Sequence, residues 1–206
     1  MNDISFIGAG FMSRVIAARA VAGGNAVEII ARDEAKATAV AEALGGGATT
    51  AKFGAVPGGD IVVLGLPAAD IEQVVREYGD SLAGKILVDI TNPFNSTATG
   101  LARPDGTSIA ELVAGAAPAS AHVIKAFNTV FGACLAKGGK VDVFFAGDDA
   151  QAMASFGTFV ASLGLRPLDV GGLSMAQWME ATALLMMGLA GHGVGNFDFV
   201  LGVTAV

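Results

Sequence analysis

A glycine-containing segment near the amino terminus has the residue types and the spacing that phosphate binding requires. Gly8 and Gly10 directly follow an apolar run, residues 4–7, and Ser13 stands where the pattern Gly-x-Gly-x-x-Gly would have its third glycine. Between a strand and a helix, the first glycine permits a tight turn, and the second lets backbone N–H groups approach a pyrophosphate. The spacing therefore indicates a site for the diphosphate of a dinucleotide.

The elements predicted around this segment support that interpretation, which the short pattern alone would not carry. A strand over residues 4–7 precedes it, and an alanine-rich stretch compatible with a helix, residues 11–21, follows it. After Gly23 and Gly24 comes a second strand, residues 27–31. This strand–helix–strand unit of about 30 residues is the setting that a dinucleotide-binding loop needs. The alternative is that the glycines only form a turn.

The residues after the second strand indicate which dinucleotide binds. An NAD site usually has an acidic residue there, which accepts hydrogen bonds from the ribose. Here Arg32 follows the strand and Lys36 comes one helical turn later, so a guanidinium and an ammonium suited to a phosphate fall on the same side. Asp33 is explained as the N-cap of the next helix. We therefore predict NADP(H); the alternative is a solvated basic face on a surface helix.

The composition of the whole chain favours an α/β domain. Its 206 residues suffice for one such domain, and 53% of them are hydrophobic while only 15% are charged, as suits a sheet covered by helices on both faces. The net charge of −7 argues against nucleic acid as a main partner. Because Cys134 is the only cysteine, an intrachain disulfide and a cysteine-rich metal site are excluded. We predict no metal site, and a buried thiol in a reducing compartment.

The carboxyl-terminal segment raises the question of a membrane. Residues 178–206 contain no lysine or arginine, but the uninterrupted apolar part, residues 181–190, is too short to span a bilayer. Glu180, His192, Asp198 and several glycines interrupt the rest. We predict a buried helix or a subunit interface there, no membrane segment and no signal peptide, and hence a cytoplasmic protein.

Strand and helix patterns alternate along the rest of the chain. We expect further strands over residues 49–53, 60–67, 86–90, 123–127, 141–146 and 166–170, and helices over residues 33–44, 69–78, 108–113, 149–163 and 174–190 with another ending at 137. A polar connection covers residues 98–106. The alternation predicts an α/β fold, a Rossmann-type doubly wound and largely parallel sheet with a C-terminal helical extension. We divide it into an NADP-binding domain, residues 1–172, and a helix with a glycine-rich tail, residues 173–206, that completes an acceptor pocket or a dimer interface.

Ligands of such sheets bind outside the carboxyl ends of the strands. Four loops are expected there, namely residues 8–13, 66–68, 91–94 and 127–129. The first two would run along the cofactor and the others would line its nicotinamide end. There Phe94 and Phe127 would exclude water, while Asn92 and Asn128 could donate to a carboxamide. The alternative for Asn92 and the proline after it is an ordinary turn.

Taken in order, the motifs along the chain resemble a known family. They are Gly8-Ala9-Gly10, Ala31-Arg32-x-x-x-Lys36, Leu66-Pro67, Thr91-Asn92-Pro93, Ile124-Lys125-Ala126-Phe127-Asn128-Thr129 and Gly147-Asp148-Asp149, followed by a similar segment at residues 166–171. The series, which covers nearly the entire chain, resembles the coenzyme F420-dependent NADP oxidoreductases (NADPH-dependent F420 reductases). That family is in turn similar to the N-terminal domain of the STEAP metalloreductases. The resemblance implies a homodimer that transfers hydride between NADPH and a deazaflavin, coenzyme F420.

The resemblance also implies roles for individual residues. The cofactor-binding residues it indicates are Gly8, Ala9, Gly10, Phe11 and Met12 at the pyrophosphate, Arg32 and Lys36 at the 2′-phosphate, and Leu66, Pro67, Asn92, Pro93, Phe127 and Asn128 at the nicotinamide. Two positions depart from the family pattern. Ser13 replaces the usual glycine but is small enough for close packing of helix on strand. Ala31 replaces the hydroxyl residue that often precedes the arginine, which removes one phosphate donor.

Hydride transfer between two ring cofactors needs little acid–base chemistry from the protein, which has to stack the rings in a dry pocket. Only two histidines and one tyrosine are present. Tyr78 and His122 fit structural roles in a helix and a strand. His192, between two glycines, is the freer candidate for lining an acceptor pocket.

Two other functions remain open at this point. The first is an NADPH-dependent imine or carbonyl reductase, for which Lys125, a lysine in an otherwise apolar strand, would be the proton donor. The structural alternative for Lys125 is an ammonium paired at the sheet edge or extended to water. The second is a sensor that binds NADP without catalysis. The sequence does not identify the hydride acceptor or the direction of the reaction.

Overall fold

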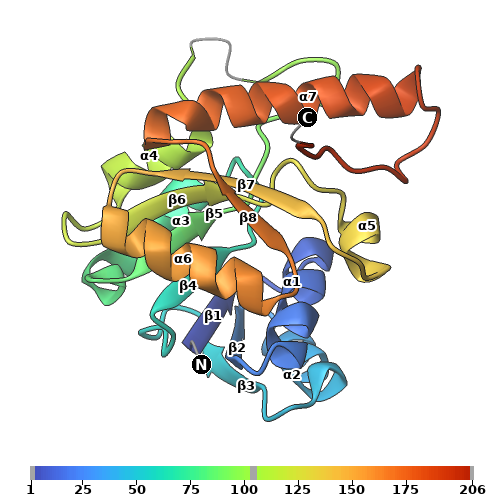
Figure 1. Ribbon diagram of the computed structural model, residues 1–206. Helices are drawn as coiled ribbons and strands as arrows, with labels where there is room; N and C mark the ends of the chain where they lie inside the picture. The colour runs from blue at the N-terminus through green and yellow to red at the C-terminus, as the bar shows by residue number, and fades with distance from the viewer. Residues whose placement is uncertain (1–2, 103–105, 205–206) are drawn as a thin grey trace.

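An eight-stranded sheet forms the centre of the structure, a computed structural model that describes residues 3–102 and 106–204 (Figure 1). Its strands are β1 (Asp3–Ile7), β2 (Ala26–Ala31), β3 (Thr49–Lys52), β4 (Ile61–Leu64), β5 (Ile86–Asp89), β6 (His122–Ala126), β7 (Asp142–Gly147) and β8 (Arg166–Asp169). They lie in the order β3-β2-β1-β4-β5-β6-β7-β8, and neighbouring strands are parallel except β6 and β7. The order reverses between β1 and β4, which is the position where doubly wound sheets bind their ligands.

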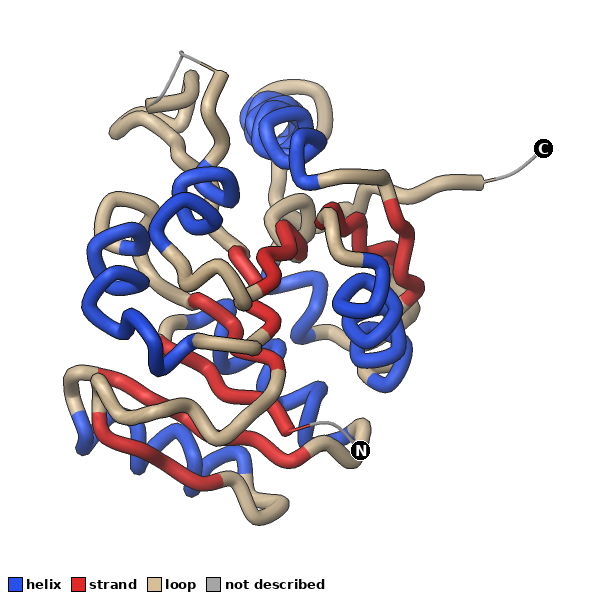
Figure 2. The backbone as a smooth tube through the Cα atoms, turned by 90° about the vertical axis from the view of Figure 1, so that its left-hand side faces the viewer, coloured by secondary structure: helices blue, strands red, loops and turns tan. Residues whose placement is uncertain are grey.

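Helices cover both faces of this sheet, as the view in Figure 2 shows. They are α1 (Phe11–Ala22), α2 (Glu34–Leu44), α3 (Ile71–Tyr78), α4 (Ile109–Ala116), α5 (Gly132–Ala136), α6 (Ala150–Ser162) and α7 (Ala176–Gly191), with short 3₁₀ turns η1 (Gly79–Leu82) and η2 (Leu173–Met175). Buried side chains of α1, α2 and α6 pack on one face, and those of α3, α4 and the start of α7 on the other. Among the described helices, none combines the length and the apolar composition that a membrane crossing needs.

Two hydrophobic cores result from the alternation of side chains along the strands. Ile4 and Phe6 of β1 face the first core, whereas Ile7 faces the second. In β4, Val63 belongs to the first core and Val62 to the second. Central strands buried on both faces explain why the sequence has continuous apolar runs there rather than alternating ones.

The predicted fold class is confirmed, with small differences at element ends. The expected strand through residue 67 ends at Leu64, because the chain turns away at Gly65 to form a loop. The helix that was expected to end at residue 137 is short, Gly132–Ala136. Lys125 does not lie at a sheet edge, since β6 has neighbours on both sides. Residues 103–105 of the predicted polar connection and residues 205–206 of the predicted tail lie outside the described residues.

Arg19 ties helix α1 to two distant parts of the chain. Its Nε donates to the carbonyl oxygen of Leu135 at 2.9 Å, and its Nη1 donates to that of Leu163 at 3.1 Å. A third bond, from Nη2 to the carbonyl oxygen of Gly139, is 3.3 Å long. The acceptors lie at and after the end of α5 and just after α6, so one side chain joins α1 to the backbone at the ends of two other helices.

Replacing Arg19 with methionine should lower the free energy of unfolding by about 1–3 kcal/mol, because partly buried carbonyl oxygens lose a charged donor while the apolar stem is kept. Urea denaturation followed by circular dichroism measures the change. The matched control is Arg76→Met, which removes an ion pair with Glu72 on the exposed side of α3 and should change the stability by less than about 0.5 kcal/mol. Equal effects of the two substitutions would contradict this account of Arg19.

Candidate active site

The glycine loop after β1 is pressed against the loop after β4. Gly8 has φ +113°, and its N–H donates to the carbonyl oxygen of Ile30 at 2.8 Å. A Cβ atom on Gly8 would lie 2.1 Å from the carbonyl oxygen of Gly65. The position therefore requires glycine twice, for its left-handed backbone and for the close approach of a second chain segment.

Ser13 completes this contact from helix α1. Its side chain is 1% exposed, and a Cβ atom on Gly65 would lie 1.9 Å from the Ser13 Oγ. Serine therefore occupies the place of the third glycine and packs directly on the loop after β4. The prediction that this residue is small enough for close packing agrees with the geometry. Its hydroxyl has no hydrogen-bond partner among the described residues.

The amino terminus of α1 opens at the end of this loop. Gly10 is the N-cap residue, has an extended backbone and is exposed, and no side chain caps the helix. A Cβ atom on Gly10 would meet only the Gly65 carbonyl oxygen, at 4.0 Å. The first N–H groups of a 12-residue helix therefore face an accessible position, where the helix dipole favours an anion.

Arg32 and Lys36 lie exposed at the end of β2 and in the first turn of α2. The Arg32 guanidinium carbon stands 5.0 Å from the centre of the Phe53 ring, which orients its planar group. The carboxylate of Asp33 caps α2 by accepting from the Lys36 N–H at 3.0 Å, as predicted. Lys36 also lines a hollow of about 260 Å³ together with Arg14 of α1. Within the described residues, neither Arg32 nor Lys36 forms an ion pair, so both charges are available to an anion.

The loops after β5 and β6 are joined by their asparagines. The Asn92 Nδ2 donates to the carbonyl oxygen of Asn128 at 2.8 Å, and the Asn128 Nδ2 donates to the Asn92 Oδ1 at 3.0 Å. The two predicted amides therefore come together, although each spends one donor on the other. Phe127 has φ +60°, a strained value for a residue with a side chain, and it redirects the chain at the end of β6.

Buried polar atoms without a partner gather at the same loops. Besides the Ser13 Oγ, the Thr91 Oγ1, the Asn128 Oδ1 and the Thr129 Oγ1 are buried and accept or donate no hydrogen bond within the described chain. A buried polar group without a partner costs free energy, and native structures rarely keep several together without a use. These atoms follow β5 and β6, where a ligand of the carboxyl edge would meet them.

Lys125 lies beneath these loops at the centre of a buried charge cluster. Its Nζ donates to the Asp89 Oδ2 at 2.8 Å, to the carbonyl oxygen of Thr91 at 2.7 Å and to the Glu180 Oε1 at 2.8 Å. The side chains of Lys125 and Asp89 are 0% exposed and that of Glu180 is 2% exposed. All three N–H groups of the ammonium are thus used within the protein.

Glu180 reaches this cluster from helix α7, and its Oε1 also accepts from the Ile109 N–H at the start of α4 at 2.9 Å. Burial raises the pKa of the Glu180 carboxyl above its ordinary value of 4.5, and the nearby Asp89 acts in the same direction, whereas Lys125 acts against the rise. The carboxylates of Asp89 and Glu180 share one ammonium. The attraction of Glu180 to Lys125 therefore does not offset the loss of hydration of its carboxylate, and the pKa stays raised.

The other predicted residues have varied places. Leu66 is half-buried against the second core, and the next residue, Pro67, is exposed. The Phe127 ring packs edge-on against Phe156 in the first core, with centroids 6.0 Å apart, so its ring does not line the loops as predicted. Phe94 is half-buried. His192 is exposed at the carboxyl end of α7.

The predicted structural roles of Tyr78 and His122 agree with their contacts. The Tyr78 hydroxyl accepts from the Gly54 N–H at 2.9 Å, and the ring packs against Phe53. The His122 Nδ1 lies 3.8 Å from the Asp149 Oδ2. No cluster of potential metal ligands is present among the described residues.

Sequence reasoning missed Asp89 and Glu180. Both are acids in strongly apolar surroundings, Asp89 at the end of a strand and Glu180 in an apolar helix. An acid in an apolar stretch is a signal for a buried partner, and Lys125 was a matching signal in β6. The pairing of the three residues could not be read from spacing, since they are far apart in the sequence.

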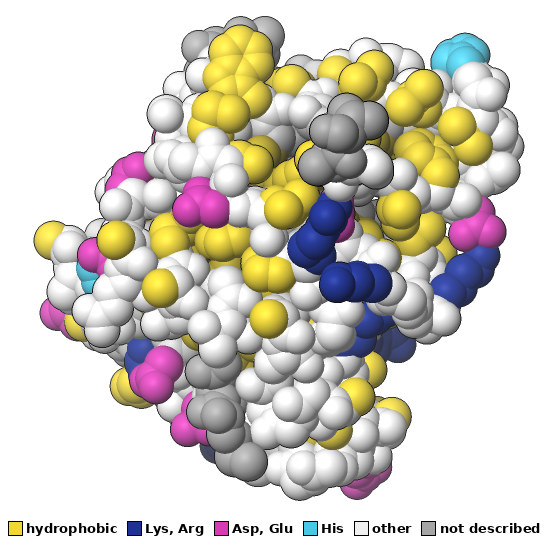
Figure 3. All heavy atoms as spheres, viewed as in Figure 1, with side chains coloured by type: hydrophobic (Ala, Val, Ile, Leu, Met, Phe, Trp, Pro, Cys, Tyr) yellow, Lys and Arg dark blue, Asp and Glu magenta, His cyan; other side chains and the backbone are white. Residues whose placement is uncertain are grey.

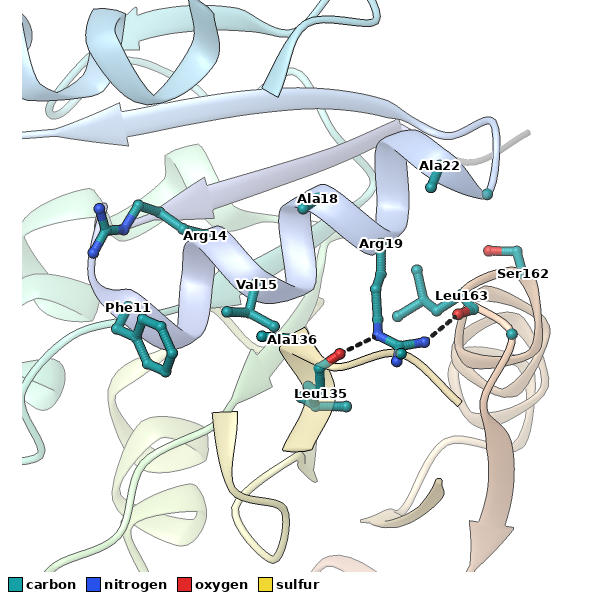
Figure 4. Close-up of a pocket in the computed structure, with 13 residues that line it drawn as sticks. Phe11, Arg14, Val15, Ala18, Arg19, Ala22, Leu135, Ala136, Ser162 and Leu163 are labelled. Carbon is teal, nitrogen blue, oxygen red and sulfur yellow. Dashed lines mark hydrogen bonds between the residues drawn. The ribbon is translucent and has the colours of Figure 1, made fainter. Parts of the chain in front are cut away.

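A larger hollow of about 770 Å³ lies along the flank of α1, from Phe11 beside the glycine loop to Ala22, and none of the residues after β5 or directly after β6 that form the predicted loops line it. Figure 4 shows Arg19 between α1 and the segments of Leu135 and Leu163, with its two shorter hydrogen bonds dashed. Phe11 and Arg14 stand at the end of α1 that begins at the glycine loop. The guanidinium of Arg19 is occupied by backbone carbonyl oxygens, so this hollow offers mainly apolar walls to a ligand.

Comparisons with known proteins agree with the resemblance predicted from the motifs. Residues 3–93 match the family model described as NADP oxidoreductase, coenzyme F420-dependent. The chain is 32% identical over 141 residues to the F420-dependent NADP reductase of Methanocaldococcus jannaschii, covering 64% of this chain and 62% of that protein. It is 28% identical over 187 residues to the metalloreductase STEAP3 of Rattus norvegicus, covering 89% of this chain and 37% of that protein.

A solved structure has the same fold over its whole length. A crystal structure from Arthrobacter sp. FB24, provisionally named an F420-dependent NADP-reductase, superposes with a TM-score of 0.86 at 26% identity and covers 100% of both chains. The chain thus spans less than two thirds of the two curated relatives, but all of this structural neighbour. The predicted resemblance and the predicted fold are both confirmed.

Replacing Glu180 with glutamine should change how stability depends on pH. As the pH falls from the raised pKa of Glu180 toward its ordinary value of 4.5, the folded wild-type protein takes up a proton before the unfolded chain does. Its free energy of unfolding therefore rises over this interval relative to that of the variant, which keeps an acceptor for Lys125 but cannot titrate. Above the raised pKa the ionised carboxylate is a cost, so the variant should be the more stable protein in that range of pH.

Urea denaturation of both proteins at a series of pH values from neutral down to 4.5 measures this difference. A difference that does not vary with pH would contradict the assignment. A wild-type protein that loses stability relative to the variant as the pH falls would contradict it more strongly, because attraction to Lys125 would then outweigh burial.

Proposed function

We propose that this chain, whose residues 3–93 match the F420-dependent NADP oxidoreductase model, binds NADP(H) and transfers hydride between its nicotinamide and a deazaflavin of the F420 type. The observation that carries the proposal is the meeting of the Gly8 loop and the Gly65 loop where the strand order reverses. That contact leaves backbone N–H groups and a helix amino terminus facing the carboxyl edge of the sheet.

The residues at this edge fit NADP(H) along its length. Gly8 and Gly10 leave no side chain between the backbone and a pyrophosphate, and Gly8, Ala9, Gly10, Phe11 and Met12 would hold it. Arg32 and Lys36 present unpaired charges for the 2′-phosphate. The partnerless oxygens of Thr91, Asn128 and Thr129 offer hydrogen-bonding groups to the nicotinamide half, beside Leu66, Pro67, Asn92 and Pro93.

NADPH supplies the hydride when it is bound, so the protein's residues only have to place the two rings and keep out water. The paired Asn92 and Asn128 hold the loops after β5 and β6 together. Phe127 contributes through its strained backbone, which directs Asn128 toward the edge, while its ring stays in the core.

The proposed acceptor rests on the relatives named F420-dependent and on the segment after β8. Helix α7 reaches the carboxyl edge, since its Glu180 contacts Lys125 of β6. The tail beyond it packs on α5, with Phe131 between Phe197 and Phe199 at centroid distances of 5.4 and 5.3 Å. We propose that residues 173–206 complete the acceptor side, with His192 as a lining residue.

The alternative of an imine or carbonyl reductase with Lys125 as the proton donor is not favoured by the geometry. A proton donor must reach its substrate, whereas the Lys125 ammonium is fully buried and spends all three N–H groups on protein oxygens. No specific observation favours the sensor either, although the turnover experiment below separates it from an enzyme.

Association into homodimers stays a prediction. Exposed apolar side chains on the surface support it. Apolar side chains gather over α7 and the tail in Figure 3, and Trp178 is 60% exposed and Leu185 64% exposed. Exposed patches of this kind mark interaction sites. The cytoplasmic location likewise stays a prediction, in accord with the free and buried thiol of Cys134.

The function is tested by turnover with NADPH and a set of acceptors: coenzyme F420, FMN, a ferric chelate and a cyclic imine. We expect loss of the NADPH absorbance with the deazaflavin and not with the cyclic imine, because reduction of an imine needs a positioned proton donor and the ammonium of Lys125 is buried and fully hydrogen-bonded. Oxidation with the imine alone would overturn the deazaflavin assignment. Tight NADPH binding without turnover of any acceptor would identify a sensor instead.

Cofactor selectivity is tested by Arg32→Ala. Loss of a charge-assisted contact to the 2′-phosphate should weaken NADPH binding by roughly tenfold to a hundredfold and leave NADH binding nearly unchanged. Isothermal titration calorimetry gives both affinities. Arg76→Ala, on the exposed side of α3, is the matched control and should alter neither affinity. An equal loss for the two dinucleotides would refute the role of Arg32.

A further inference from the structure

The loop after β5 has little regular structure of its own to hold it in place. Its backbone is fixed at Thr91, whose N–H donates to the Asp89 Oδ1 at 2.9 Å and whose carbonyl oxygen accepts from the Lys125 Nζ at 2.7 Å. Both bonds are buried. The buried charge cluster of Asp89, Lys125 and Glu180 therefore holds both polar groups of one peptide residue at the site.

The position of Lys125 is in turn determined by two carboxylates on different elements. Asp89 ends β5, and Glu180 lies on α7. With three oxygens around one ammonium and no exposure, Lys125 has one arrangement available. Removing it leaves two carboxylates facing each other without a cation, a strongly destabilising state.

A displacement of Thr91 would be passed on to the residues next to it. Asn92 follows immediately and is bonded in both directions to Asn128 of the neighbouring loop. The Thr91 Oγ1 and the Asn128 Oδ1 are two of the partnerless atoms at the carboxyl edge. The cluster thus supports the part of the edge that lies at the proposed nicotinamide end, and it does not touch the glycine loop.

We propose that Lys125 is a positioning residue, which together with Asp89 and Glu180 fixes the loop of residues 91–93 against helix α7 so that the nicotinamide is held in one orientation. This inference rests on the proposed function, since it concerns the same cofactor. On this proposal the buried lysine holds the site residues in place. It neither transfers a proton nor serves only to stabilise the fold.

The test compares NADPH with 2′,5′-ADP, a fragment that has the 2′-phosphate but no nicotinamide. In Lys125→Met, the affinity for NADPH should fall by roughly tenfold while the affinity for the fragment is kept, because only the nicotinamide end loses its support. The fluorescence of bound NADPH should also shift toward that of the free cofactor. A role limited to stability would lower the melting temperature and leave the ratio of the two affinities unchanged.

A second variant keeps the experiment decisive if Lys125→Met does not fold. Lys125→Met combined with Glu180→Gln removes one of the two carboxylates that Lys125→Met leaves without a cation, so it should be more stable than Lys125→Met alone. The Thr91 carbonyl oxygen still lacks its donor, and we expect the affinity ratio to stay roughly tenfold lower than in the wild type. Recovery of the wild-type ratio along with stability would overturn the proposal.

Lys85→Met is the matched control, since Lys85 is also a largely buried lysine close to an acid but lies at the amino end of β5, 3.9 Å from Asp60. Its affinity ratio should equal that of the wild type. Failure of the wild-type protein to bind 2′,5′-ADP would contradict the proposed function itself. Binding of the fragment with no change of ratio in either Lys125 variant would contradict only the positioning role.

Discussion

The contact between Gly8 and Gly65 is the constraint on which the arrangement of the site depends. Two backbone segments that follow neighbouring parallel strands approach so closely that neither tolerates a side chain, and the Ser13 hydroxyl fills the remaining space. This contact brings the start of α1 to the point where the strand order reverses. Once that helix end is fixed, the distance along the sheet to the end of β2 determines where Arg32 and Lys36 lie relative to it, and this is the separation on which the proposed cofactor site depends.

The buried charge cluster of Asp89, Lys125 and Glu180 fixes the other half of the carboxyl edge in the same way. Loss of one of its charges would cost more free energy of unfolding than loss of an ordinary contact. Leaving a buried charge without its partner costs about 3–5 kcal/mol, although replacing a whole buried pair with apolar residues is often neutral. The cluster is therefore poor evidence for stability and better evidence for a specific geometry. It ties β5, β6 and α7 at one point, with Ile109 of α4 as a further donor.

The parts of the site that the sequence predicted well are those encoded locally. The tight turn at Gly8, the close packing at Ser13 and the Asp33 N-cap each depend on a few consecutive residues within one strand–helix–strand unit. The binding of a 2′-phosphate by Arg32 and Lys36 stays a prediction. The doubly wound and largely parallel class of the sheet was also predicted, because continuous apolar strand patterns alternate with helix patterns along the chain.

The parts that escaped prediction depend on contacts between distant segments. Glu180 meets Lys125 only after α7 has folded back over the sheet, and the three bonds of Arg19 join residues more than a hundred positions apart. Phe127 adopts a left-handed backbone that no glycine signals, so its ring was expected at the site and instead packs in the core.

The antiparallel pairing of β6 and β7 determines at which end of the sheet the chain leaves its last strand. Because β7 and β8 run against the other strands, the chain leaves β8 on the side of the amino ends, and Leu173 is held there by the carboxylate of Asp148. Helix α7, about 24 Å long, then has to travel back toward the carboxyl edge. The length of α7 therefore limits how far it can extend over that edge. A lineage could lengthen or shorten this one helix by whole turns and so reshape the proposed acceptor side without altering any strand, turn or glycine of the proposed dinucleotide site.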